Sequence, residues 1–405
     1  MTERKMKYSG DECIGLIPED WTAPRLKYHC IIKNGSDPLS NSGPIPVYGS
    51  GTGIVKYCTE YKNGPAILLG RKGTLDKPKL ITEKFWNVDT VFDAYPRKDI
   101  NIEYLYNVTK ILDILKYATC TAKPSMTQTD YNSMIIPCPD IVEQQQIVEY
   151  LDFKTASIDS AIQAQKDIVE KLKEYRQAVI TEAVTKGLNR DAEMKDSGIE
   201  WIGKIPQSWK VMPNKYLMTK QKDLCPVYNG ENILSLSMRG VYVRDPYDES
   251  GKRPKTYDGY QFVYDGDLLM CLFDIDVTPR CVGRVYDNGL TSPAYSRFVM
   301  NRKKANVDYY YYYYLALDFD KTLLHLAKNM RSSFTETDFG CINAPVPPIK
   351  EQQQIVEYLD SKTTTIDKAI EQKNAIIEKL EEYKKSIIYN AVTGKIDCRK
   401  DVIPE

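Results

Sequence analysis

Two long stretches of the chain carry a hydrophobic pattern that predicts α-helices. Residues 143–185 contain neither proline nor glycine, although prolines stand just before them and Gly187 just after, and residues 351–393 repeat this arrangement. At 1.5 Å per residue, a helix of this length would be about 65 Å long. Such a helix is too long to be enclosed by one small domain.

Apolar residues recur at spacings of three and four along one face of each predicted helix. They are Ile158, Ile162, Val169, Leu172 and Val179 in the first stretch, and Ile366, Ile370, Ile377, Leu380 and Ile387 in the second. Each stripe needs a partner, and the chain between them is long enough to turn back, so the pattern predicts an antiparallel coiled coil. The alternative, in which each stripe packs on its own globular region, is disfavoured by the helix length and the absence of helix breakers.

The region before each predicted helix alternates short apolar runs with turn residues, which predicts strands. The runs are 45–49, 53–58, 66–70 and 85–95 in the first region, and 232–237, 240–245, 267–273, 282–287 and 297–301 in the second. A helix over about 103–117 follows in the first region, and one from the tyrosines at 309–314 to about 328 in the second. Six consecutive tyrosines invite base stacking, but helical spacing spreads them around the helix and favours an amphipathic packing helix. The predicted fold class is mixed α/β (α+β).

Much of this pattern occurs twice because segments of the sequence are repeated. EQQQIVEYLD begins at Glu143 and at Glu351, an SGxExIGxIPxxW motif begins at Ser9 and at Ser197, and residues 123–131 align with 331–339. These repeated segments form a common frame around two dissimilar fillings. They indicate a pseudo-twofold internal duplication, with one structural unit used twice with two specificities. The predicted domains are two similar globular regions at 1–142 and 191–349, long helices at 143–190 and 350–396, and a tail at 397–405.

Composition and charge change this picture little. With 405 residues, 42% of them hydrophobic, the chain is long enough for two ordinary globular domains. No apolar run suits a signal peptide or a membrane span, so we expect a cytoplasmic protein without membrane contact. Ten cysteines without a CxxC pair are expected to be reduced core thiols. The net charge is zero, and the excess of two basic residues in each strand-rich region is only weak support for nucleic-acid binding.

Motifs that would carry catalysis are mostly absent. GSGTG at residues 49–53 lacks the third glycine of a dinucleotide-binding loop, and GRKGT at 70–74 lacks the GK[ST] of a phosphate loop. Two histidines, His29 and His325, leave little material for a zinc site or a Ser-His-Asp triad. The Asn-Pro-Pro-aromatic loop of amino-methyltransferases is missing. We therefore expect neither catalytic residues nor a metal site.

Polar loops with arginine, lysine and small hydroxyl residues remain, in corresponding places of the two regions. Such side chains suit contacts with DNA, arginine to guanine and serine or lysine to backbone oxygens, although any single one could be an ordinary solvated surface group. The candidate DNA-binding residues are Lys33, Tyr48, Ser50, Arg71, Lys72, Lys123, Ser125, Arg239, Arg253, Arg280, Arg331 and Ser333.

Taken together, the motifs PxPxxxEQxxIVxxLDxxTxxIDxxI and SGxExIGxIPxxW, each present twice, resemble the DNA-specificity subunit of type I restriction-modification enzymes. GPIPVYGSGTGI with ILLGRKGT, and GLTSPAYSRF at 289–298, are similar to versions of that family's target-recognition domain. The resemblance implies two such domains held apart by the helical pair, each reading half of a split double-stranded DNA site. It also implies two docked methyltransferase subunits and, through them, ATP-dependent restriction and translocase subunits. S-adenosylmethionine, ATP and magnesium would belong to those partners, and this chain would bind no cofactor.

Three other functions stay open at this point. The chain could be a specificity subunit of a methyltransferase-only or other restriction system, a stand-alone DNA-modifying enzyme, or a coiled-coil adaptor without DNA contact. The missing catalytic motifs argue against an enzyme. One sequence gives no code that relates loops to bases, so neither the DNA sequence recognised nor its gap follows from it.

Overall fold

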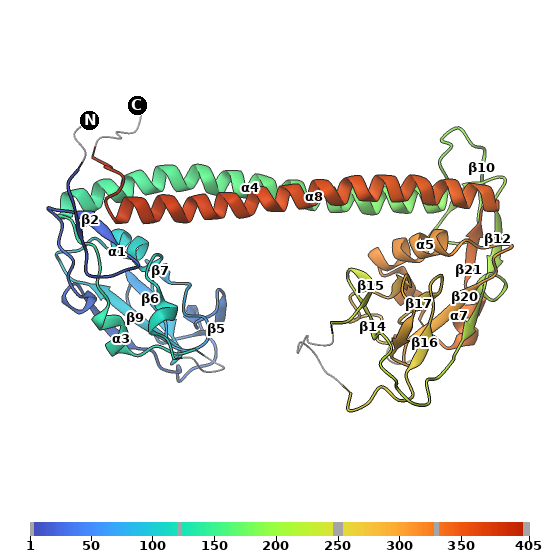
Figure 1. The fold of residues 1–405 in the computed structure, drawn as a ribbon, viewed down its shortest axis with the longest axis horizontal. Coiled ribbons are helices and arrows are strands. Elements are labelled where there is room, and N and C mark those ends of the chain that lie inside the picture. Colours follow the sequence, from blue (N-terminus) through green and yellow to red (C-terminus); the bar gives the residue numbers. More distant parts are fainter. Residues whose placement is uncertain (1–3, 120–123, 246–253, 328–331, 400–405) are drawn as a thin grey trace. The chain divides into compact units, whose positions relative to one another are not determined.

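The computed structural model describes residues 4–119, 124–245, 254–327 and 332–399. The chain forms two compact units: unit 1 comprises Met1–Lys166 and Asn374–Glu405, and unit 2 comprises Asp167–Lys373. Two long helices, α4 (Ile141–Lys186) and α8 (Ile349–Val392), each contribute one part to each unit (Figure 1). The helix α4 begins two residues before its predicted start at 143, and α8 begins one residue before its predicted start at 350. Asp140 explains this for α4, because its carboxylate accepts hydrogen bonds from the backbone N–H groups of the first turn (2.9 and 3.0 Å).

Unit 1 is built on a four-stranded antiparallel sheet in the order β3-β9-β6-β7. Its strands are β3 (Cys30–Asn34), β9 (Val91–Pro96), β6 (Ala66–Gly70) and β7 (Lys79–Ile81). A second sheet has the order β5-β4-β8, from β5 (Ile54–Cys58), β4 (Ile45–Tyr48) and β8 (Trp86–Asn87). The remaining strands and short α-helices are β1 (Met6–Tyr8), β2 (Leu16–Pro18), α1 (Ile102–Thr109), α2 (Ile114–Tyr117) and α3 (Gln128–Ser133), and a 3-10 helix spans Leu26–Tyr28.

Unit 2 has a four-stranded antiparallel sheet in the order β13-β20-β17-β18. Its strands are β13 (Met218–Gln221), β20 (Ser296–Met300), β17 (Leu268–Met270) and β18 (Val282–Arg284). The unit also has four two-stranded sheets. They pair β10 (Met194–Asp196) with β11 (Lys204–Pro206), β12 (Lys210–Pro213) with β21 (Asn343–Val346), β14 (Leu234–Ser237) with β15 (Gly240–Val243), and β16 (Gln261–Val263) with β19 (Gly289–Thr291). The helices are α5 (Val307–Phe319), α6 (Thr322–Leu326) and α7 (Glu336–Cys341).

The two fillings share one topology although their sequences differ. In each unit a hairpin, β4–β5 or β14–β15, follows the edge strand of the four-stranded sheet and precedes its central strand, β6 or β17. Each hairpin also pairs in parallel with a later segment: β4 with β8, and Ile233 with Leu290. The duplication predicted from the frame therefore extends through the fillings.

Two predicted elements of unit 1 are interrupted in the structure. The strand predicted over 85–95 is two strands, β8 and β9, because the backbone turns at Val88, whose carbonyl accepts from the N–H of Val91 (3.1 Å). The helix predicted over about 103–117 ends at Thr109 and resumes at Ile114.

The tyrosine-rich helix α5 is a packing helix, but the prediction that it is amphipathic was wrong. Tyr309, Tyr310, Tyr313 and Tyr314 are fully buried and only Tyr311 is partly exposed, so the helix is covered on nearly every side. Part of the cost of burying these phenols is offset because several of their hydroxyls find acceptors. Tyr309 donates to the carbonyl of Val184 (2.9 Å) and Tyr310 to that of Pro345 (3.0 Å).

The repeated glutamines attach each long helix to its unit. The Gln144 amide accepts from the N–H of Asn101 (2.8 Å) and donates to the carbonyl of Pro139 (2.9 Å). In unit 2 the buried Gln352 makes the same two bonds, to Asn306 (2.8 Å) and Pro347 (2.9 Å). Both asparagines are the N-caps of the helix that follows them, α1 or α5.

Replacing Gln352 by alanine is expected to lower the free energy of unfolding by about 1–3 kcal/mol, because a partly buried N–H and a buried carbonyl lose their partner. Gln353, its exposed neighbour, bonds only side chains at the surface, those of Asn306 (3.0 Å) and Glu357 (3.2 Å), so Gln353→Ala is expected to cost about 1 kcal/mol or less. Urea titration of the purified variants measures both values. Equal losses would mean that the buried glutamine does not attach the helix.

A glycine at the end of each long helix packs against the tryptophan of the SGxExIGxIPxxW motif. Gly394 has a φ of +69°, and a Cβ there would lie 2.4 Å from the Pro18 ring and 3.0 Å from Trp21. Gly187 has a φ of +74°, and a Cβ there would lie 3.2 Å from Trp209. The conformation and the close approach both require glycine. The glycine after each long helix and the tryptophan motif are therefore repeated together, because they form the same contact in each unit.

Candidate nucleic-acid interface

In unit 1 three loops that carry candidate residues lie together. The loop after β6 pairs with residues 124–126, since Lys72 and Ser125 form an antiparallel bridge and the N–H of Met126 donates to the carbonyl of Arg71 (2.9 Å). The tip of hairpin β4–β5 joins them, because the Ser50 hydroxyl lies 3.4 Å from where a Cβ on Gly73 would be. Ser50, Arg71, Lys72 and Ser125, distant in sequence, thus share one surface.

The two cations of this surface differ in mobility. Arg71 is partly buried, donates to the carbonyl of Asp89 (3.1 Å) and lies over the Phe92 ring (5.8 Å), so its guanidinium is held in place. Lys72 is exposed, and its ammonium is 3.7 Å from the Asp89 carboxylate. Exposed pairs of this kind contribute little, so Lys72 can turn to an external anion.

Lys79, which is not among the candidates, supports the hairpin tip. Its ammonium donates to the carbonyls of Gly49 and Gly51 and lies 5.4 Å from the centre of the Tyr48 ring. Partial burial lowers its pKa. A lysine on a short strand gives no sequence signal for this role, because its partners are backbone carbonyls of a distant loop.

The structure separates Lys33 from this surface. Lys33 is exposed on β3, the edge strand at the far side of the sheet from β7, and its ammonium lies 4.9 Å from the centre of the Tyr95 ring. Candidates Lys123, Arg253 and Arg331 lie outside the described residues. Ser333 is partly buried beside the segment after β17, where Phe334 N–H donates to the carbonyl of Leu272 (2.9 Å), the counterpart of the Met126 bond in unit 1.

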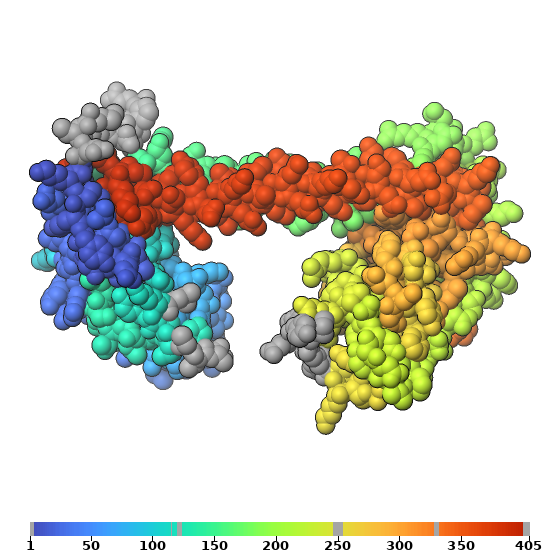
Figure 2. Space-filling view, viewed as in Figure 1, coloured from blue at the N-terminus to red at the C-terminus, as the bar shows by residue number. Residues whose placement is uncertain are grey.

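In unit 2, Arg239 and Arg280 lie close together. With Met238 they line two neighbouring hollows of about 600 and 450 Å³. Arg239 is exposed at the turn of hairpin β14–β15, whose yellow-green atoms are at the surface in Figure 2. Arg280 is mostly buried; its guanidinium donates to the carbonyl of Met238 (3.5 Å), and its Nε lies 3.9 Å from the Asp318 carboxylate. Arg239 and Arg280, both predicted DNA-binding candidates, therefore share one cationic surface of unit 2.

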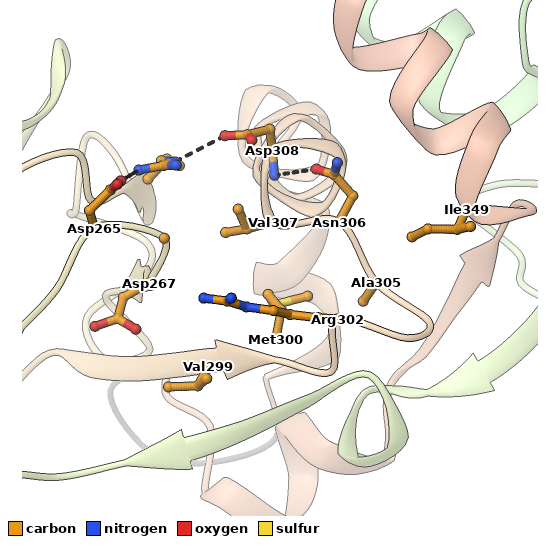
Figure 3. Close-up of a pocket in the computed structure, with 12 residues that line it drawn as sticks. Asp265, Asp267, Val299, Met300, Arg302, Ala305, Asn306, Val307, Asp308 and Ile349 are labelled. Carbon is orange, nitrogen blue, oxygen red and sulfur yellow. Dashed lines mark hydrogen bonds and ion pairs between the residues drawn. The ribbon is translucent and has the colours of Figure 1, made fainter.

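Other arginines of unit 2 are held in internal ion pairs. The pocket drawn in Figure 3, which is lined by Asp265 and Asp308, has a volume of about 410 Å³. Arg284 also lines it and bridges the two carboxylates, at 3.0 Å from Asp308. The Arg284 guanidinium lowers the pKa of Asp265. The buried Arg297 is paired with Asp267 at 2.5 Å. These pairs satisfy the side chains within the fold, so we assign this pocket a structural role.

The predicted packing residues of the long helices are all buried or partly buried. Ile158, Ile162, Val169, Val179, Ile366 and Ile387 are buried, and Leu172, Ile370, Ile377 and Leu380 are partly buried. Two polar residues at this seam, Arg176 and Lys384, form ion pairs that are equivalent under the repeat. Arg176 lies 3.0 Å from Asp367 in unit 2, and Lys384 lies 2.6 Å from Asp159 in unit 1. Both pairs run between antiparallel segments, which fixes the register of α4 against α8 within each unit.

Each long helix also exposes apolar side chains one heptad apart. Ile168 (37% exposed) and Tyr175 (54%) lie on α4 in unit 2, and their counterparts Ile376 (39%) and Tyr383 (58%) lie on α8 in unit 1. Residues seven apart share a helix face. Each unit therefore has one such face, here called the Ile/Tyr face.

Neither a metal-ligand cluster nor a membrane-spanning helix occurs among the described residues. Among them, no group of three His, Cys, Asp or Glu side chains is placed to hold a metal ion. In the same part of the chain, none of the helices combines the length and apolar character needed to cross a membrane.

Comparison with known proteins agrees with this geometry. The family of type I restriction modification DNA specificity domains matches residues 18–186 and 213–382, once for each half of the chain. A putative type I restriction enzyme MjaX specificity subunit of Methanocaldococcus jannaschii is 27% identical over 312 residues, covering 72% of this chain and 67% of that protein. The MjaVIII specificity subunit of the same organism is 25% identical over 354 residues, covering 82% of this chain and 77% of that protein.

A solved structure shows the same fold. It comes from work on complex assembly and conformational transition of the type I R-M system, and has a TM-score of 0.66 at 14% identity, covering 94% of this chain and 99% of that chain. The family match covers most of the sequence and both halves of the duplication. The chain thus belongs to the type I restriction-modification DNA specificity family, as a non-catalytic subunit that recognises DNA.

Proposed function

We propose that each unit reads one half of a bipartite double-stranded DNA site and that the helical pair sets the gap between the halves. The observation that carries this proposal is the shared topology of the two fillings around unlike loops. In both units a hairpin stands at the same point in the order of elements, but the residues on the two hairpins differ. The recognition domains would be residues 1–142 and 191–349.

The proposed DNA contacts are the two loop surfaces described above. In unit 1 they are Tyr48, Ser50, Arg71, Lys72 and Ser125, and in unit 2 they are Arg239 and Arg280. A held arginine beside a mobile lysine suits one base-edge contact and one phosphate contact. Lys33, Lys123, Arg253, Arg331 and Ser333 stay candidates on their residue type alone.

The proposed partners are two methyltransferase subunits, one on each Ile/Tyr face. Support comes from the repetition itself: the exposed apolar pairs recur at equivalent positions of both units, so two copies of one partner find the same surface. ATP-dependent restriction and translocase subunits would join through the methyltransferases. S-adenosylmethionine, ATP and magnesium would be bound by these partners.

Exchanging residues 22–122 for the corresponding filling of a related protein is expected to change one half of the methylated motif only. Those residues contain hairpin β4–β5 and the loop after β6, whereas the filling of unit 2 is untouched. Sequencing of methylated bases in a strain with the complete complex reads both halves. A change in both halves would contradict independent reading by the two units.

A further inference from the structure

Hairpin β14–β15 presents two residues at a tightly fixed turn. Ser237 pairs with Gly240, so Met238 and Arg239 alone form the turn, and both are exposed. The Ser237 hydroxyl accepts from the N–H of Arg239 (3.1 Å), and Gly240 has a φ of +95°, which other residues rarely adopt. The backbone that carries the two side chains is therefore held in a defined turn.

The hollow of about 600 Å³ beside this turn combines apolar walls with two guanidinium groups. Phe273 and Tyr295 line it with rings 6.3 Å apart and 26° from parallel, and Val277 is 73% exposed. The guanidiniums belong to Arg239 and Arg280. A DNA phosphate presents only polar oxygens and gains nothing from apolar walls. The edge of a base presents acceptors next to carbon atoms, so it matches both the guanidiniums and the apolar walls of this hollow.

We infer that Arg239 is a specificity-determining residue that donates to the O6 and N7 acceptors of a guanine in the major groove, with Met238 against the apolar edge of the adjacent base. This inference rests on the proposed function, in which unit 2 reads one half of the site. A two-stranded ribbon fits the major groove, and the planar fork of arginine matches the two acceptors of guanine.

The equivalent hairpin of unit 1 carries different chemistry. Its tip, residues 49–53, is Gly-Ser-Gly-Thr-Gly, without an arginine, and Lys79 is engaged with its carbonyls. The hairpins stand at the same place in the order of elements of the two units, between the edge strand and a central strand of the four-stranded sheet. We therefore expect a guanine contact by the hairpin tip only in the half-site that unit 2 reads.

The test uses the full chain in complex with its methyltransferase, with methylated bases mapped across the genome. Arg239→Ala is expected to relax one G·C position in one half of the motif, with a preference for that base about 10- to 100-fold lower, and to leave the gap and the other half unchanged. Arg239→Lys keeps the charge but not the fork, so it should lose the base preference while the salt dependence of DNA binding stays. Arg302→Ala is the matched control, because Arg302 is an exposed arginine of unit 2 that lines a different pocket.

Three results would overturn the inference. They are an unchanged motif in Arg239→Ala, relaxation in the other half, and a uniform loss of affinity for all sequences with a shallower salt dependence, which marks a phosphate contact. The proposed function itself fails in a different way: the wild-type complex would then not methylate a two-part motif.

Discussion

Aspartate in place of both Ile168 and Tyr175 is expected to detach a methyltransferase subunit and abolish methylation of DNA. These side chains form the Ile/Tyr face of unit 2 and are about two-fifths and one-half exposed, so they can be covered by a partner without refolding. Two carboxylates buried in an apolar contact would lose hydration without gaining a partner. Loss of two central apolar anchors is expected to weaken binding by about 30-fold or more. Co-purification with the methyltransferase and analytical ultracentrifugation measure the stoichiometry.

The control for this variant is Ile168→Leu with Tyr175→Phe, which keeps the apolar face and should keep both subunits. The equivalent change at Ile376 and Tyr383 should remove the other subunit, and the fourfold variant should remove both. DNA binding by the isolated chain reports whether the fold survives. Full stoichiometry in the aspartate variants would place the docking surface elsewhere.

Adding four residues to each long helix, after Lys166 in α4 and after Lys373 in α8, is expected to lengthen the gap between the two halves of the methylated motif. Both points are boundaries of the units, so the contacts within each unit are kept. Four residues add about 6 Å to a helix, close to the rise of two base pairs at ~3.4 Å each. They also add little more than one helical turn, so the apolar stripes rotate only slightly. The gap is expected to grow by about one or two base pairs, read by methylome sequencing.

A four-residue insertion within the exposed segment 41–44 controls for added length outside the helices and should leave the gap unchanged. Insertion in α4 alone leaves α8 without matching length and should reduce the stability of the helical pair. An unchanged gap with full methylation in the double insertion would show that the helices do not set the spacing.

The sequence predicted the parts of the fold that depend on local periodicity. The long helices follow from their stripes and missing breakers, and the duplication follows from repeated segments. The shared sheet order of the two fillings could not be predicted, because strand pairing is set by contacts between segments far apart, such as Cys30 with Pro96. The burial of the tyrosines in α5 escaped prediction for a related reason: the groups that cover a phenol or accept from its hydroxyl come from distant segments, as the carbonyl of Val184 does for Tyr309.

The candidate DNA-binding site was less accessible to sequence reasoning. Residue type singled out Arg71, Lys72, Arg239 and Arg280, and the structure places them on two loop surfaces. Residue type equally singled out Lys33, which lies at the other side of its sheet. It did not separate arginines that face outward from Arg284 and Arg297, whose carboxylate partners come from distant positions.

Unit 1 is closed by both ends of the chain. The Tyr389 hydroxyl donates to the carbonyl of Ile14 (3.0 Å), and Gly394 lies against Trp21, whereas unit 2 is the single segment Asp167–Lys373. During synthesis, therefore, the ribosome releases every residue of unit 2 before the last part of unit 1 exists. The first unit to be started is the last to be finished, and the contact between its tryptophan and Gly394 forms only after the whole of α8 has been made. A message that ends before codon 374 would yield a complete second unit and an unfinished first one.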